Sequence, residues 1–116
     1  MDGRIGAGEP EDLGRLFLER AASGDVEGIV ALYAEDALLA TPAGGALRGR
    51  AAIRDFYRAL LPARPAFAGE VRPALRVGDL ALTSTRFSGG ATAEIARLQP
   101  DGTWLWVIDQ PSVLAP

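Results

Sequence analysis

The chain has 116 residues, of which 48% are hydrophobic and 23% charged, a size and composition suited to one domain with a single core. It contains no cysteine, histidine or lysine, which excludes disulfides, thiolate nucleophiles, histidine bases, ordinary zinc sites and Schiff-base lysines. Acid–base chemistry must therefore come from Asp, Glu, Tyr or water, and a net charge of −3 with scattered arginines argues against a nucleic-acid partner.

The chain is predicted to begin with a flexible arm and a helix. Residues 1–9 are rich in glycine and form the expected arm, whereas residues 10–116 form the single domain. Pro10 suits the first position of a helix. The apolar residues that follow it recur at helical spacing: Leu13, Leu16, Phe17 and Ala21. Ser23 and Gly24 then end this helix.

A second helix and a short strand come next. The helix is predicted over about residues 26–34, where Asp25 can cap the N-terminus and one face is apolar. That face comprises Val26, Ile29, Val30 and Tyr33. Residues 38–41 read as a short strand that Pro42 ends.

A third helix is predicted over roughly residues 50–61. Its core face carries apolar residues at the same spacing: Ile53, Phe56, Tyr57 and Leu60. The opposite face carries Arg50, Arg54 and Arg58, a like-charge stripe that needs partners. The stripe is either a solvated face paired with Glu27 or Glu35, or a site for an anionic ligand.

After the third helix the apolar period changes to two, which is typical of strands. Residues 71–77 alternate, and turns at 78–79, 89–90 and 100–102 separate strands predicted at 80–88, 92–99 and 103–110. The sequence therefore predicts an α+β domain. Three N-terminal helices pack in the concave face of a curved, mainly antiparallel sheet, which includes a four-stranded meander.

Three segments resemble the nuclear-transport-factor-2-like superfamily, particularly its SnoaL-like and ketosteroid isomerase-like branch. They are GDVEGIVALYAEDA at residues 24–37, LRGRAAIRDFY at residues 47–57 and DGTWLWVIDQP at residues 101–111. The resemblance implies a cone-shaped, cystatin-like roll whose sheet curls around the helices and leaves an apolar pocket open at one end. It also implies a homodimer formed through the sheet.

The resemblance carries over only part of the catalytic machinery of ketosteroid isomerase. It places the general base of that enzyme at Thr41, the oxyanion tyrosine at Phe17, a supporting tyrosine at Tyr57 and the buried acid at or near Glu94. Thr41 cannot take up a proton near neutral pH, and Phe17 has no hydroxyl group. Steroid isomerisation by the known mechanism is therefore not expected.

Two carboxylates remain as candidates for acid–base chemistry. Glu94 is one of them, if its strand turns it toward the pocket. Asp109 shares a strand face with Leu105 and Val107, and the resemblance places this face inside the cone. Burial in an apolar cavity would raise the pKa of either carboxyl group into the useful range. We predict Asp109 and Glu94 as catalytic residues, with Tyr57 as a hydrogen-bond donor.

The remaining pocket residues are predicted to bind the ligand: Phe17, Tyr33, Leu39, Thr41, Phe56, Leu60 and Val107. Each candidate also has a purely structural interpretation. Glu94 could pair with Arg76 or Arg86 across the sheet, and Asp109 could anchor the chain end near Pro111. No metal is expected, because no loop has the carboxylate spacing of a magnesium or calcium site.

The same alternation puts Trp104, Trp106 and Ile108 on the outside of the sheet. Such a patch is large enough to imply a partner, and the resemblance makes a homodimer through this face the expected one. If the strand faces the other way, the tryptophans line the pocket and Asp109 lies on the surface.

The sequence thus predicts a small-molecule pocket protein. The first hypothesis is a cofactor-independent SnoaL-like enzyme that carries out isomerisation, cyclisation or hydration/dehydration on an apolar, polyketide-like substrate of bacterial secondary metabolism. The alternatives are a dimeric module that binds a hydrophobic ligand without turnover, and a structural dimer whose pocket is filled. No apolar run reaches the length of a membrane span and the N-terminus does not resemble a signal peptide, so we expect no membrane partner and a cytoplasmic location.

Overall fold

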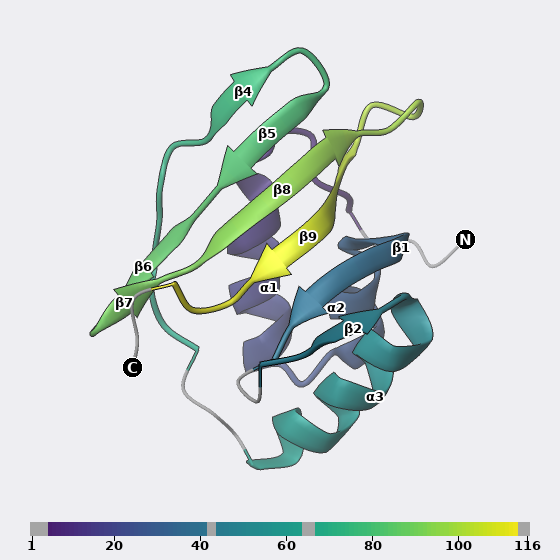
Figure 1. Ribbon diagram of the computed structural model, residues 1–116, viewed down its shortest axis with the longest axis vertical. Coiled ribbons are helices and arrows are strands. Elements are labelled where there is room, and N and C mark those ends of the chain that lie inside the picture. The colour runs from purple at the N-terminus through teal and green to yellow at the C-terminus, as the bar shows by residue number, and fades with distance from the viewer. Residues whose placement is uncertain (1–4, 42–43, 64–66, 114–116) are drawn as a thin grey trace.

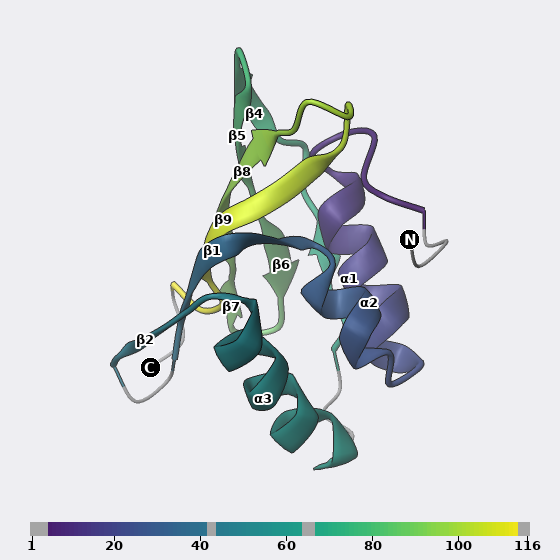
Figure 2. The ribbon, with the colours of Figure 1, turned by 90° about the vertical axis from the view of Figure 1, so that its right-hand side faces the viewer.

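In a computed structural model, which describes residues 5–41, 44–63 and 67–113, a curved sheet is covered on one side by helices (Figure 2). The helices are α1 (Asp12–Ala22), α2 (Val26–Val30) and α3 (Arg50–Leu60), and a 3₁₀ turn (Leu61–Ala63) follows α3. The predicted α+β class is confirmed. Among the described residues, no helix has the length and apolar character needed to cross a membrane.

Six strands form the large sheet, in the order β2-β1-β9-β8-β5-β4 (Figure 1). Their bounds are β1 (Tyr33–Ala40), β2 (Ala46–Arg48), β4 (Leu75–Val77), β5 (Leu80–Thr83), β8 (Ala93–Leu98) and β9 (Trp104–Gln110). β1 and β9 run parallel, and the other pairs in this sheet are antiparallel. The first and last strands in chain order, β1 and β9, therefore lie side by side in the large sheet.

A second, three-stranded sheet has the order β3-β6-β7. It is formed by β3 (Glu70–Val71), β6 (Thr85–Phe87) and β7 (Gly90–Ala91). The single strand predicted over residues 80–88 is thus divided at Ser84, because β5 pairs in the large sheet and β6 pairs in the small one. This change of sheet carries Thr85 and Phe87 round toward the helices and helps to close the cone.

The second helix is shorter than predicted, and the strand after it is longer. α2 ends at Val30, and Tyr33 is the first residue of β1 instead of the last core residue of the helix. The apolar residues 29–33 fit both patterns, and the pairing of Tyr33 with Trp106 on β9 decides between them. The predicted cap is present, because the Asp25 carboxylate accepts a hydrogen bond from the Gly28 N–H at 3.0 Å. Pro42, the predicted end of the strand, lies outside the described residues.

The arginine stripe on α3 is paired within the protein. The Arg54 and Arg58 side chains contact the Glu27 carboxylate at 2.9 and 3.4 Å. The Arg50 Nε donates to the backbone carbonyl of Tyr33 at 2.8 Å. The predicted pairing with Glu27 is confirmed. These contacts tie α3 to α2 and to the start of β1.

A bulge in β9 determines which side chains face the helices. On β8 the consecutive residues Ile95 and Ala96 pair with Ile108 and Trp106 of β9. Val107, which lies between these two partners, is therefore an extra residue on β9. The extra residue shifts the alternation by one position. Trp106 and Asp109 therefore both point to the concave side, although an unbroken strand would place them on opposite faces.

The prediction that Trp104 and Trp106 lie on the outer surface is wrong. Their relative exposures are 1% and 3%, and both belong to the core. Ile108 is the member of the predicted outer set that is exposed, at 48%. Ala7, which falls within the predicted arm, is buried and forms a bridge to Trp104, so residues near it pack against β9.

Candidate functional site

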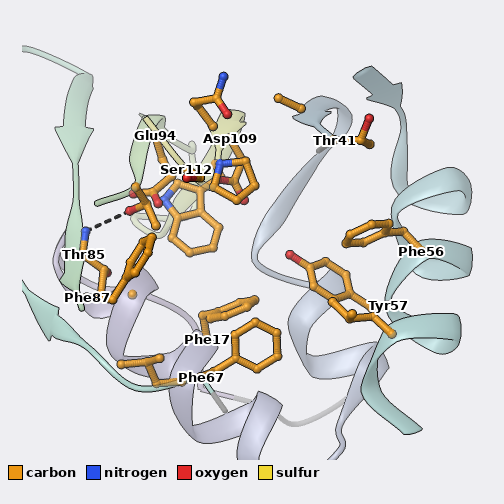
Figure 3. Close-up of a pocket in the computed structure, with 18 of the residues that line it drawn as sticks. Phe17, Thr41, Phe56, Tyr57, Phe67, Thr85, Phe87, Glu94, Asp109 and Ser112 are labelled. Atoms are coloured by element: carbon orange, nitrogen blue, oxygen red, sulfur yellow. Dashed lines mark hydrogen bonds between the residues drawn. The ribbon is translucent and has the colours of Figure 1, made fainter. Parts of the chain in front are cut away.

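A cavity of about 710 Å³ lies between α1, α3 and the concave side of the sheets (Figure 3). Its wall is mostly apolar, and the polar groups gather on β8, β9 and the adjoining strand ends. The lining residues are Gly14, Phe17, Leu18, Ala40, Thr41, Phe56, Tyr57, Leu60, Phe67, Ala68, Thr85, Phe87, Thr92, Glu94, Trp106, Asp109, Gln110, Pro111 and Ser112.

The apolar wall is built from aromatic rings contributed by three different segments. The Phe17 ring of α1 packs edge-on against Phe67 at 5.2 Å and Tyr57 at 5.9 Å between ring centroids. Phe56 and Tyr57 of α3 contact each other at 5.2 Å. Such edge-to-face contacts favour fixed orientations of the rings that form the wall.

The two predicted carboxyl groups lie on neighbouring strands and face the same cavity. Glu94 on β8 and Asp109 on β9 are directly paired in the sheet, and both are 5% exposed. Figure 3 shows them together at one end of the cavity, across from Phe56 and Tyr57 of α3. The bulge at Val107 is what turns Asp109 to this side.

Asp109 is held by a row of hydroxyl groups. The Tyr33 hydroxyl donates to Asp109 Oδ2 at 2.5 Å, and the hydroxyl oxygens of Tyr33 and Tyr57 are 3.0 Å apart. The pKa of Asp109 is raised to about 7: burial is the largest cause, the charge of Glu94 acts in the same direction, and the hydrogen bond from Tyr33 opposes both. Burial also raises the pKa of both tyrosines, so the two phenols stay protonated.

Glu94 is held by a second hydrogen-bonded chain with a fixed direction. The Trp106 indole Nε1 donates to Thr83 Oγ1 at 3.0 Å, and Thr83 Oγ1 donates to Glu94 Oε1 at 2.6 Å. An indole N–H can only donate, so the single Thr83 proton is left for Glu94. Burial raises the pKa of Glu94, while hydrogen bonds from Thr83 and Thr92 lower it.

The structure separates the predicted ligand-binding residues into two groups. Phe17, Thr41, Phe56 and Leu60 line the cavity. Tyr33, Leu39 and Val107 are not among the lining residues. Tyr33 and Leu39 are fully buried, and Val107 is the half-buried extra residue of the bulge.

The sequence interpretation missed several residues of the site. Thr83 and Trp106 were not proposed as partners of Glu94, and Phe67 and Thr92 were not proposed as wall residues. The alternation of β5 pointed to Thr83, since it pairs directly with Glu94 across the strands. The bulge that brings Trp106 inward has no equally clear sequence signal.

The alternative ion pair of Glu94 with Arg76 or Arg86 is not observed. Glu94 instead accepts a hydrogen bond from the Thr83 hydroxyl. The Arg76 guanidinium lies over the Trp104 ring, 4.9 Å from the ring centroid. Arg86 lies opposite Glu70 in the pairing of β6 with β3. Among the described residues that line the cavity, none is basic. Among the described residues as a whole, no group of acidic side chains has the arrangement of a metal site.

The cavity can bind an apolar molecule and present it with groups that exchange protons. It is large enough for a ligand of several rings, it is walled by aromatic side chains, and it carries two carboxyl groups and a tyrosine. These features define a cone-shaped α+β protein with an acid-containing small-molecule pocket. A model of the SnoaL-like domain matches residues 15–112, and the chain belongs to this family.

Known proteins similar to this chain agree with the assignment. A steroid Delta-isomerase from Nocardioides simplex is 51% identical over 49 residues, which cover 41% of this chain and only 40% of that protein. A ketosteroid isomerase-like protein from Erwinia carotovora atroseptica has a TM-score of 0.76 at 17% identity, over 91% of this chain and 94% of that chain. A protein described as a candidate dehydratase of the NTF2-like family, from Streptomyces avermitilis, has a TM-score of 0.70 at 19% identity, over 89% and 92%. The two structures show that the fold is shared.

Proposed function

We propose that the protein is a cofactor-independent acid–base enzyme that acts on an apolar small molecule. The observation that carries this proposal is the Asp109 carboxyl group, which lies in an apolar cavity with its pKa raised to about 7. A group with this pKa is divided between its two protonation states near neutral pH, so it can both accept and return a proton. The reaction class is isomerisation, cyclisation or hydration/dehydration.

The two carboxyl groups have different roles in this proposal. Asp109 removes a proton from the substrate, because a pKa raised to about 7 makes its carboxylate an effective base near neutral pH. Glu94 receives donors from Thr83 and Thr92, which favour its charged form. The Glu94 charge in turn keeps the pKa of Asp109 high. Tyr57 is the pocket hydroxyl placed to contact an oxygen atom of the substrate.

The lining supports a neutral, apolar substrate. Aromatic rings cover most of the wall, and none of the described lining residues is basic, so an anionic group would find no counter-charge there. A polycyclic ketone of the polyketide type combines a large apolar surface with acidic C–H groups next to a carbonyl. Such a compound fits both the wall and the two carboxyl groups.

Hydrogen exchange at the α-carbon tests the proposal without knowledge of the natural substrate. Aromatic ketones such as 2-tetralone are incubated with the protein in D₂O, and deuterium uptake is followed by mass spectrometry. We expect the wild-type protein to accelerate exchange, and Asp109→Asn to lose on the order of 10²-fold or more of that acceleration. Asp36→Asn, at an exposed position on β1, is the matched control and should keep the full rate.

An equal rate in Asp109→Asn would refute the role of Asp109. Binding of the ketones without any exchange would favour the second candidate, a module that holds a hydrophobic ligand without turnover. One feature favours that candidate: Phe17 and Thr41 line the cavity at positions where the resemblance to ketosteroid isomerase implies a tyrosine and a general base.

We also propose that the protein forms a homodimer through the outer face of the large sheet. Support comes from a row of apolar side chains on paired positions of β4, β5, β8 and β9, the outer apolar row: Leu75, Leu82, Ile95 and Ile108. Leu75, Leu82 and Ile108 are 69%, 41% and 48% exposed in the single chain. A contiguous exposed row of this kind is typical of an interface.

A further inference from the structure

Tyr33 links two groups of the pocket without reaching the pocket itself. Asp109 and Tyr57 both line the cavity, whereas Tyr33 is fully buried behind them and contacts each through its hydroxyl oxygen. The three groups come from β9, α3 and β1, so the link joins distant parts of the chain. Tyr33 can therefore affect a ligand in the cavity through Asp109 and Tyr57, although it does not line the cavity itself.

The direction of the hydrogen bonds along this row is limited by the number of protons. Each tyrosine hydroxyl has one proton to donate and can also accept. While Asp109 is ionised, Tyr33 must donate to it, as the 2.5 Å contact requires. The contact between the two tyrosines is then satisfied only if Tyr57 donates to Tyr33. In that state the Tyr57 proton points away from the cavity.

Protonation of Asp109 releases this constraint. A neutral carboxyl group is a weaker acceptor than a carboxylate, and it has a proton of its own to donate. The Tyr33 hydroxyl can then donate to Tyr57, and the Tyr57 hydroxyl is free to donate into the cavity.

We propose that Tyr33 is a positioning residue that couples the protonation state of Asp109 to the orientation of the Tyr57 hydroxyl, so that the pocket binds a ligand with a carbonyl-type acceptor oxygen best when Asp109 is protonated. The inference rests on the proposed function only in that Asp109 changes its protonation state during the reaction. In that reaction, transfer of a C–H proton to Asp109 breaks the C–H bond and leaves its electron pair on the substrate as an enolate. The same transfer frees the Tyr57 proton to bind the enolate oxygen at the moment when that oxygen becomes negative.

The groups that surround Asp109 are few and can be separated by experiment. Glu94 faces it from β8, Tyr33 from β1 and Tyr57 from α3. The arginines of the packed helices are engaged elsewhere, in ion pairs or with backbone carbonyls: Arg15 with Asp12 and Glu19, Arg20 with Gly28 and Ile5, Arg50 with the carbonyl of Tyr33, and Arg54 and Arg58 with Glu27. Asp55 of α3 is exposed to solvent and does not line the cavity. Glu94 is therefore the one other carboxyl group that the test must separate from Asp109.

Equilibrium binding of two matched probes tests the coupling. The ketone 2-acetylnaphthalene carries an acceptor oxygen, and 2-ethylnaphthalene has nearly the same shape without it; neither titrates between pH 5 and 9. Binding is followed by NMR or by tryptophan fluorescence at pH 5.5 and pH 8.5. For the wild-type protein we expect the Kd of the ketone to rise about 3- to 10-fold with pH, the value of one neutral hydrogen bond. The Kd of the hydrocarbon should change less than about twofold.

Three variants separate the coupling from simpler explanations. Tyr33→Phe should bind the ketone with nearly the same Kd at both pH values, because the link is lost. Tyr57→Phe should bind it weakly at both, and it serves where Tyr33→Phe does not fold. Asp109→Asn, which keeps a donor on a neutral group, should bind it tightly at both.

Specific results would overturn the inference. If Tyr33→Phe or Tyr57→Phe keeps the wild-type ratio, Asp109 acts on the ligand directly. If Asp109→Asn keeps the pH dependence, Glu94 is its source. A wild-type protein that shows no pH-dependent preference for the ketone would also refute the coupling. The experiment requires no turnover, so the coupling can hold even if the exchange assay fails, and the two failures can be told apart.

Discussion

Replacing Asp109 with asparagine isolates the energetic cost of burying its carboxyl group. In the folded chain its pKa is about 7, against 3.8 for the exposed group in the unfolded chain. The folded state therefore binds more protons than the unfolded state between these two values. The contribution of this group to stability is greatest below about pH 4, falls as the pH rises toward 7 and levels off above that.

The size of the effect follows from the difference between the two pKa values. Each pKa unit corresponds to about 1.36 kcal/mol, so a shift of about three units costs about 4 kcal/mol at pH 8. The group is almost fully buried, so little solvent screening reduces this figure. In a chain of this length, about 4 kcal/mol corresponds to a change in Tm on the order of 15 °C. Asparagine can still accept the hydrogen bond from Tyr33 and carries no charge, so Asp109→Asn should not lose this stability as the pH rises.

Urea denaturation of the wild-type protein and Asp109→Asn from pH 4 to pH 9 measures this contribution. The difference between the two curves removes the titration of the other carboxyl groups, which both proteins share. We expect the free energy of unfolding of Asp109→Asn, relative to that of the wild-type protein, to increase by about 3–4 kcal/mol between pH 4 and pH 8. A difference that stays constant with pH would mean that Asp109 has no raised pKa in the folded state, and the assignment of Asp109 as a base would be lost with it.

Three further predictions concern the neighbours of the site and the surface. Thr83→Val should cost about 2 kcal/mol in urea denaturation and raise the pKa of Glu94 further in an NMR titration, because the indole N–H and the carboxyl group lose their shared partner; an unchanged stability would refute the hydrogen-bonded chain. Gly28→Ala should cost about 1–2 kcal/mol, since its Cβ would collide with the carboxylate that caps α2, whereas Gly45→Ala, whose Cβ would meet Thr41 Oγ1 at an ordinary contact distance of 3.8 Å, should be nearly neutral. Leu82→Arg should convert the proposed dimer to a monomer in light scattering without lowering the Tm of the monomer; a wild-type protein that is monomeric at 100 µM would remove the dimer proposal.

Local pattern was sufficient for most of the fold but failed where tertiary pairing decides the structure. The helix starts, the Asp25 cap and the antiparallel strands follow from spacing and turn residues. The boundary between α2 and β1 does not, because the residues before Tyr33 satisfy helical and strand periods equally well. The parallel pairing with β9 settles it, and that contact joins residues more than 70 positions apart.

The candidate site also depends on pairing that local sequence patterns do not predict. Strict alternation along 103–110 offered two options, with either Asp109 or Trp106 inside, and the structure adopts neither. One extra residue at Val107 turns both side chains inward. A bulge leaves the composition and the average period of a strand unchanged, so a single sequence gives little sign of it. The Tyr33 link was missed for a related reason, since its role depends on two partners from other elements.

The energetics of Asp109 bear on why the residue is there. A buried carboxyl group that costs about 4 kcal/mol above neutral pH removes a large share of the 5–15 kcal/mol that stabilises a typical domain. An apolar residue of similar size at this position would avoid that cost, yet β9 carries a bulge whose effect is to turn the carboxyl group inward. Structural anchoring alone explains this poorly, because a hydrogen bond from Tyr33 stabilises the folded state by only about 1–3 kcal/mol. The arrangement is better explained if the function of the carboxyl group requires it to change its protonation state. This argument favours the proposed acid–base enzyme over the alternative of a module that binds its ligand without turnover.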